Sequence, residues 1–137
     1  KQQTGDNWQA TRRELEGEWS DFRRSVSNAH SRLIAWDETR EQRFNAHLDE
    51  ADAALRRSAA DDAAVAADVR IRISEARDDL KTKAAQARRS YDAWRKERAD
   101  ERLLRNLDDS ELELDEAFDR YSVALDSVQR GARPRAD

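Results

Sequence analysis

The chain of 137 residues contains no cysteine and no methionine, and it has only one proline and three glycines. Without cysteine it can form no disulfide, thiolate metal site or cysteine nucleophile. The three glycines are far apart, so they form no phosphate-binding loop. Because a translation product starts with methionine, we expect a processed chain or a fragment, and the compartment stays open. No apolar run approaches the roughly 20 residues that a membrane-spanning helix needs.

Net charge and large apolar side chains are also scarce. The 26 basic and 30 acidic residues nearly cancel, which leaves a net charge of −4, and only 37% of the residues are hydrophobic. Interspersed charges with a slight acidic excess argue against nucleic-acid binding. The apolar residues recur at helical spacing, which argues against disorder. Alanine, glutamate, lysine, leucine and arginine dominate the chain, a composition typical of long helices and coiled coils.

The longest amphipathic pattern runs over residues 8–55. Its apolar residues first alternate in steps of four and three, as in a coiled-coil seam. An eleven-residue period, which favours straight or slightly right-handed helices, then links Phe22, Leu33, Phe44 and Leu55. The pattern predicts one continuous helix over residues 7–57. The alternative is a break near Ser27, which would give four shorter helices.

Two further helices follow in the pattern. Ser58 and Asp61 have the spacing of a capping box, so a turn is expected there, followed by a helix over 61–107. A strand-like alternation over 69–73 is interpreted as helix, because no other segment could pair with a strand. Asp108, Ser110 and two following glutamates predict a second turn over 106–110, then a third helix over 110–130 and a tail over 131–137.

These elements predict an all-α fold with a single elongated domain over residues 1–137. The first two helices form a long antiparallel hairpin that resembles a coiled coil, with mixed heptad and eleven-residue periodicity. The third, shorter helix folds back and makes a three-helix bundle at one end. This arrangement brings Phe118, Tyr121 and Leu125 level with Trp19, Phe22 and Val26, so Phe118 is expected to contact Trp19.

The sequence indicates no catalytic, cofactor-binding or metal-binding residue. His30 and His47 are the only histidines, and each follows an Asn-Ala pair. Neither has a glutamate three residues before it, as di-iron bundles require, and the two do not share a helix face. Carboxylates are abundant, but thirty of them on long helices form chance pairs. We therefore expect no metal, no cofactor and no enzymatic activity.

Paired arginines recur along the chain, at 12–13, 23–24, 56–57 and 88–89. One interpretation is a basic flank that meets anionic lipid or an acidic partner. The preferred interpretation is that their stems border a helix–helix seam while the guanidinium groups reach water. The four tryptophans are expected in the core.

The function that the pattern favours is a non-enzymatic scaffold or protein-interaction module. Its partner would be protein, through self-association or another helical protein, because the apolar seam demands a partner. The first alternative is a peripheral protein that opens its bundle on anionic membranes. The second is a helical sensor or stalk domain of a larger membrane-associated protein, suggested by the missing methionine.

Overall fold

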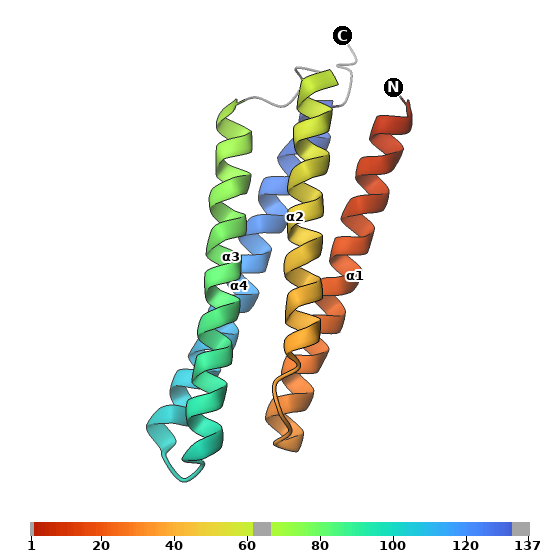
Figure 1. Cartoon of the computed structure of the whole chain (residues 1–137). Coiled ribbons are helices and arrows are strands. Elements are labelled where there is room, and N and C mark those ends of the chain that lie inside the picture. Colours follow the sequence, from red (N-terminus) through yellow and green to blue (C-terminus); the bar gives the residue numbers. More distant parts are fainter. Residues whose placement is uncertain (1, 62–66, 133–137) are drawn as a thin grey trace.

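The computed structural model describes the backbone of residues 2–61 and 67–132, and the side chains of residues 8–57 and 67–128. The described residues form four α-helices and no strand, which confirms the all-α class. The helices are α1 (Gln2–Arg32), α2 (Glu38–Asp61), α3 (Ala67–Lys96) and α4 (Glu101–Ala132) (Figure 1). The strand-like alternation over 69–73 lies inside α3, so helical packing overrides it.

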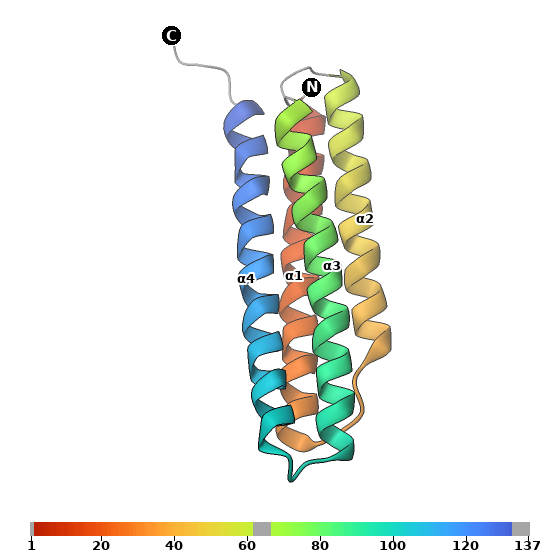
Figure 2. The ribbon, with the colours of Figure 1, turned by 90° about the vertical axis from the view of Figure 1, so that its left-hand side faces the viewer.

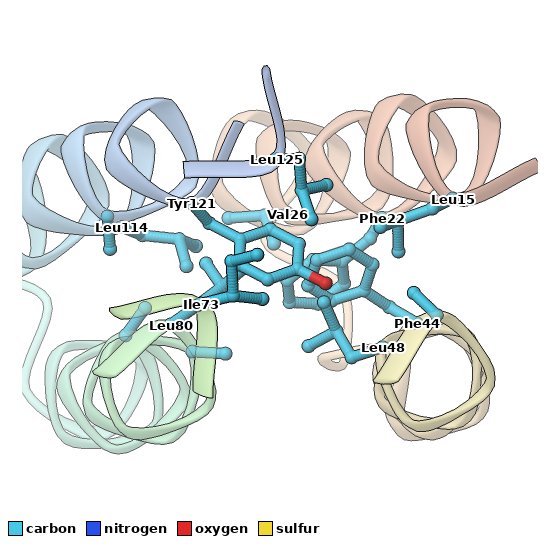
Figure 3. Close-up of a cluster of buried hydrophobic side chains, with 14 of the residues drawn as sticks. Leu15, Phe22, Val26, Phe44, Leu48, Ile73, Leu80, Leu114, Tyr121 and Leu125 are labelled. Carbon is cyan, nitrogen blue, oxygen red and sulfur yellow. The ribbon is translucent and has the colours of Figure 1, made fainter. Parts of the chain in front are cut away.

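The four helices run side by side with alternating direction, an up-down-up-down bundle. The turns after α1 and α3 lie at one end, and the start of α1 and the end of α4 lie at the other (Figures 1 and 2). Each helix occupies one corner in cross-section, in the order α1, α2, α3, α4 (Figure 3). The described residues therefore form a four-helix bundle, whereas the sequence pattern predicts a two-helix hairpin with a third helix at one end.

The continuous helix predicted over 7–57 is wrong, because the chain leaves helical geometry at residues 33–37. Leu33 has a φ of 58°, the left-handed conformation that commonly ends an α-helix. The amide of Ile34 donates to the carbonyl of Ala29 at 3.2 Å, the wide closing bond of a Schellman motif. A leucine fills a position that usually belongs to glycine, which explains why the sequence carries no obvious stop signal.

A capping residue starts α2. Asp37 Oδ1 accepts a hydrogen bond from the amide of Arg40 at 3.0 Å, which satisfies one of the free N–H groups of the first turn. The alternative of four shorter helices is closer to the structure, but its break was placed near Ser27. That residue lies inside α1.

The second predicted turn is also displaced. The chain turns at residues 97–100, and Asp100 Oδ1 caps α4 by accepting from the amide of Arg102 at 2.9 Å. Residues 106–110, where the turn was predicted, are helical. Leu107 in that segment is fully buried, so continuing the helix keeps an apolar seam that a turn there would break.

The remaining boundaries shift by a few residues. α1 begins at Gln2, ahead of the predicted start at residue 7, and α4 contains the predicted helix over 110–130 and extends to Ala132. α2 continues to Asp61, through most of the first predicted turn. The rest of that turn and the end of the tail, residues 62–66 and 133–137, lie outside the described residues.

One hydrophobic core runs along the bundle between all four helices (Figure 3). Backbones approach most closely within the α1–α2 and α3–α4 pairs. Small buried residues permit this approach: Ala29, Ala51, Ala84, Ala87 and Ala117. Larger rings fill the space between the two pairs, including Tyr91 and Tyr121, which are both buried. None of the helices, in their described residues, has an apolar stretch able to cross a membrane.

Candidate functional site: the polar seams and the outer face of α4

Ion pairs between α1 and α4 repeat with the same eleven-residue period as the core. Arg12 pairs with Asp126 at 2.6 Å, and Arg23 holds Asp115 through two nitrogens, one of them at 3.1 Å. Arg12 and Arg23 are eleven residues apart, as are the two aspartates. Since the helices are antiparallel, only one register satisfies both pairs.

The seam between α2 and α3 follows the same rule. Glu41 accepts from Arg88 at 2.7 Å, and Asp52 pairs with Arg77 at 2.8 Å, again eleven residues apart on each helix. Glu41 is only 4% exposed and also accepts a hydrogen bond from Trp36 Nε1 at 2.8 Å. Such partly buried pairs specify register more than they add stability.

The arginines at residues 12, 23, 77 and 88 therefore border helix seams and pair across them. The stems border the seams, as the preferred interpretation expects, but Arg12 is only 8% exposed, so its guanidinium group is held within the seam and does not reach open water. Arg24, the exposed member of its pair, lies 3.8 Å from Asp21. The tryptophans pack as expected, with Trp8, Trp36 and Trp94 buried and Trp19 packed against the core.

A ladder of opposite charges also joins α1 to α2. Asp21 faces Arg40 at 3.5 Å, and Glu18 faces Arg43 at 3.6 Å. One turn further along both helices, the next carboxylate of α1 is Glu14, and the position opposite it belongs to His47.

His47 thus lies in a cluster with two carboxylates. Ligand atoms of Glu14, His47 and Glu50 all lie within 4.8 Å of one another, and His47 is half-buried between two exposed glutamates. The Nδ1–H of His47 donates to the backbone carbonyl of Arg43 at 2.9 Å. Neither glutamate takes part in any ion pair found among the described side chains.

His30 lies in a second cluster, on the seam of α1 and α4. Its ring joins Asp108 and Glu111 within the same 4.8 Å limit. Here two of the three groups are already paired: His30 Nδ1 hydrogen-bonds Glu111 at 2.8 Å, and Arg23 lies 3.8 Å from the same carboxylate. The ring also packs edge-on against Trp94, with centroids 5.1 Å apart. The sequence does not reveal either cluster, because each needs a carboxylate from another helix.

Two open hollows on the surface have volumes of about 340 and 370 Å³. The first is lined by Gln9, Arg12, Arg13, Glu16 and Asp126, and the second by Asp92, Arg95, Lys96 and Arg98. Charged and polar residues line both hollows, and both are open to solvent. They lack the enclosed, largely apolar character of small-molecule sites.

The outer face of α4 carries two exposed apolar side chains, Leu112 at 58% and Val123 at 61% exposure. Together with the exposed Glu116 and Asp119 they form a stripe that steps by four, three and four residues, directly opposite the buried face of the helix. We call Leu112, Glu116, Asp119 and Val123 the α4 outer stripe. Neither acidic member of the stripe belongs to an ion pair among the described side chains, whereas Asp115 and Arg120 beside it do.

Protein-family models, curated proteins and solved structures were each compared with this chain, and none matches it.

Proposed function

We propose that this chain is a non-enzymatic scaffold and protein-interaction module, which holds a basic amphipathic helix of a partner protein on the α4 outer stripe. The observation that carries the proposal is the stripe itself, in which two acidic residues without ion-pair partners lie between exposed Leu112 and Val123. A partner helix can dock through apolar contacts spaced along one helix face, and Leu112 and Val123 offer two such contacts on one face of α4.

The apolar and acidic side chains of the stripe favour a basic amphipathic helix as the partner. A partner helix that places two apolar residues on Leu112 and Val123 would bring its two middle positions to Glu116 and Asp119. Lysine or arginine at those positions would complete two new charge pairs. Two copies of this chain packed through the same stripe would instead bring four carboxylates together, which is repulsive. An anionic membrane would meet the same repulsion.

The rest of the bundle supports a scaffold. The apolar seam that seemed to demand an external partner is packed inside the chain by the four helices. Ion pairs across the α1–α2, α1–α4 and α2–α3 seams set the register of the helices. A bundle built in this way presents one helix face in a fixed position, which is what a docking surface needs.

The test uses a synthetic helical peptide with the complementary stripe, two leucines flanking two lysines at the same four-three-four spacing. We expect fluorescence anisotropy to show binding that weakens at least tenfold in the double variant Leu112→Glu, Val123→Glu. The reason is that each apolar contact contributes about 1–2 kcal/mol, and 1.4 kcal/mol corresponds to about tenfold in affinity.

The matched control is Ile71→Glu, because Ile71 is equally exposed, at 57%, on α3. It should leave peptide binding unchanged. A peptide with glutamate in place of both lysines should bind poorly. Equal binding of the two peptides, or no binding by the unaltered protein, would contradict the proposal. Salt-sensitive co-sedimentation with anionic vesicles would favour the membrane alternative in its place.

A further inference from the structure

We infer that Glu14, His47 and Glu50 form a binding site for a divalent first-row transition-metal ion such as Zn²⁺. The site lies on the seam of α1 and α2, apart from the α4 outer stripe, and it does not depend on the function proposed for that stripe. It reverses the expectation from sequence that neither histidine holds a metal.

The charge ladder on this seam supplies the first reason. The two neighbouring ion pairs on this seam each join a carboxylate of α1 to an arginine of α2: Asp21 to Arg40 and Glu18 to Arg43. One turn further along, Glu14 of α1 faces His47 where the two preceding positions of α2 carry arginine, and Glu50 of α2 brings a second carboxylate. Two carboxylates therefore converge where the seam no longer provides a fixed cation. A bound divalent cation would neutralise the negative charge of the two glutamates.

The state of the histidine supplies the second reason. A backbone carbonyl can only accept, so the contact with Arg43 places a proton on His47 Nδ1. In neutral imidazole the other nitrogen, Nε2, then carries a lone pair. This pattern is the one found around protein-bound metals, where the second ring nitrogen usually donates to a carbonyl or a carboxylate and fixes the tautomer. All three members of the cluster can thus offer acceptor atoms, and none of them needs to act as a donor.

The spacing of the three groups is compatible with a bound ion. Zinc lies about 2.0–2.2 Å from histidine nitrogen and carboxylate oxygen, so ligand atoms in a tetrahedral site are about 3.4 Å apart. The three ligand atoms here lie within 4.8 Å of one another. The two glutamates are exposed and unpaired, so small rotations of their side chains can close this distance without disturbing the core.

The donor set selects the class of metal. Imidazole favours zinc, copper, iron and nickel over magnesium and calcium, which prefer oxygen ligands alone. Three protein ligands leave at least one position for water, as in open zinc sites. Because Glu14 belongs to α1 while His47 and Glu50 belong to α2, the ion would join the two helices. Binding should therefore stabilise the fold.

The cluster around His30 provides an internal comparison. Its Nδ1 is 2.8 Å from Glu111, which is a hydrogen bond with no space for an ion between the two atoms. The same glutamate also faces Arg23 at 3.8 Å, so a cation already lies beside it. His30 and His47 share the same Asn-Ala-His triplet, but only at His47 do both carboxylates of the cluster lie outside every ion pair found among the described side chains.

Isothermal titration calorimetry of the purified chain with ZnCl₂ near pH 7.5, in a buffer that does not chelate metals, tests the inference. We expect one bound ion per chain and a higher melting temperature with zinc than with EDTA. His47→Gln should abolish both effects, while His30→Gln should leave them unchanged. Glu14→Gln and Glu50→Gln should each weaken binding by at least about ten- to hundredfold, the loss typical of removing even an outer-shell partner.

A variant with arginine opposite Glu14 distinguishes metal binding from simple ion pairing. His47→Arg should raise the melting temperature in EDTA and remove the response to zinc. Binding to the unaltered protein that is lost in His30→Gln and kept in His47→Gln would overturn the assignment. A complete lack of zinc binding would overturn the inference itself. Circular dichroism of each variant shows whether it is folded.

Discussion

Trp19 of α1 stacks face to face on Phe118 of α4, with ring centroids 4.2 Å apart and an interplanar angle of 1°. Trp19 also lies 5.4 Å from Phe44 of α2, measured between centroids, so its ring joins three of the four helices. Backbone approach is closest within the α1–α2 and α3–α4 pairs. The stacked rings therefore join α4 to α1, in addition to the ion pairs of that seam.

Replacing Phe118 with alanine should loosen α4 from the rest of the bundle. Removing a core phenylalanine usually costs about 3–5 kcal/mol, and we expect the lower end because Phe118 is partly exposed. Urea unfolding followed by circular dichroism measures the loss. Leu112→Ala on the outer face of the same helix is the control and should change stability by less than about 0.5 kcal/mol. Equal effects of the two substitutions would show that Phe118 does not pack against Trp19.

The contact between Trp19 and Phe118 follows from sequence, although the direction of α4 does not. The predicted third helix runs parallel to the first, whereas α4 is antiparallel to α1 and pairs Arg12 with Asp126 and Arg23 with Asp115. Apolar periodicity identifies which face of a helix is buried. It carries little information on where a helix ends, and both missed turns lack glycine and proline. Their usable signals were the capping residues Asp37 and Asp100.

The candidate metal site illustrates a different limit. Glu50 is one turn from His47 and is visible in the sequence, but a histidine with one such neighbour is common on helices. The third ligand, Glu14, is brought to the site only by the turn after α1 and the register that Arg40 and Arg43 set. Because the sequence pattern predicts one continuous helix over residues 7–57, it predicts no contact between α1 and α2.

Removing the hydroxyl group should affect the free energy of unfolding differently at the two buried tyrosines. The single proton of the Tyr91 hydroxyl is shared between the carbonyls of Ala29, at 2.7 Å, and Ile34, so Tyr91→Phe should destabilise the fold by about 1–2 kcal/mol. The hydroxyl of Tyr121 is buried near the centre of the bundle and has no hydrogen-bond partner among the described residues (Figure 3). Tyr121→Phe should therefore be neutral or stabilising by up to about 1 kcal/mol. Chemical unfolding of the two variants at pH 7 compares them directly, and a larger loss for Tyr121→Phe would contradict this account.

Stability should fall at alkaline pH. Burial raises the pKa of Tyr121, and burial likewise raises the pKa of Tyr91. Above about pH 10 the unfolded chain releases tyrosine protons that the folded chain retains, so unfolding becomes more favourable as pH rises. The stabilisation is complete below that pH. For the fully buried Tyr121 the slope approaches about 1.4 kcal/mol per pH unit.

The comparison that isolates this effect is the unfolding free energy of the unaltered protein and of Tyr121→Phe between pH 8 and pH 11. The variant should show a shallower fall because it has one fewer buried proton to release. Parallel curves would mean that Tyr121 titrates alike in the folded and unfolded chains.

Gly17 lies on the exposed face of α1, and a methyl group added there would meet no atom within 4 Å. Glycine in a helix interior is less favourable than alanine by about 0.8–1.0 kcal/mol. Gly17→Ala should therefore stabilise the protein by roughly this amount and raise the melting temperature by about 4 °C. Differential scanning calorimetry measures the shift. A lower melting temperature would show that α1 needs the glycine, for instance for a close approach by another molecule.

The last prediction concerns Leu33, whose φ of 58° ends α1. A left-handed conformation costs a residue with a β-carbon about 1–2 kcal/mol, and a β-branched side chain tolerates it least. Leu33→Gly would remove this cost but lose the packing of a partly buried side chain, so the net change should be near zero. Leu33→Val keeps more apolar surface, yet it should be at least about 1 kcal/mol less stable than the glycine variant because of backbone strain. In a continuous helix the order would be reversed, since valine is a better helix former than glycine. The relative stability of these two variants in urea therefore distinguishes the turn after α1 from the unbroken helix that the apolar periodicity predicts.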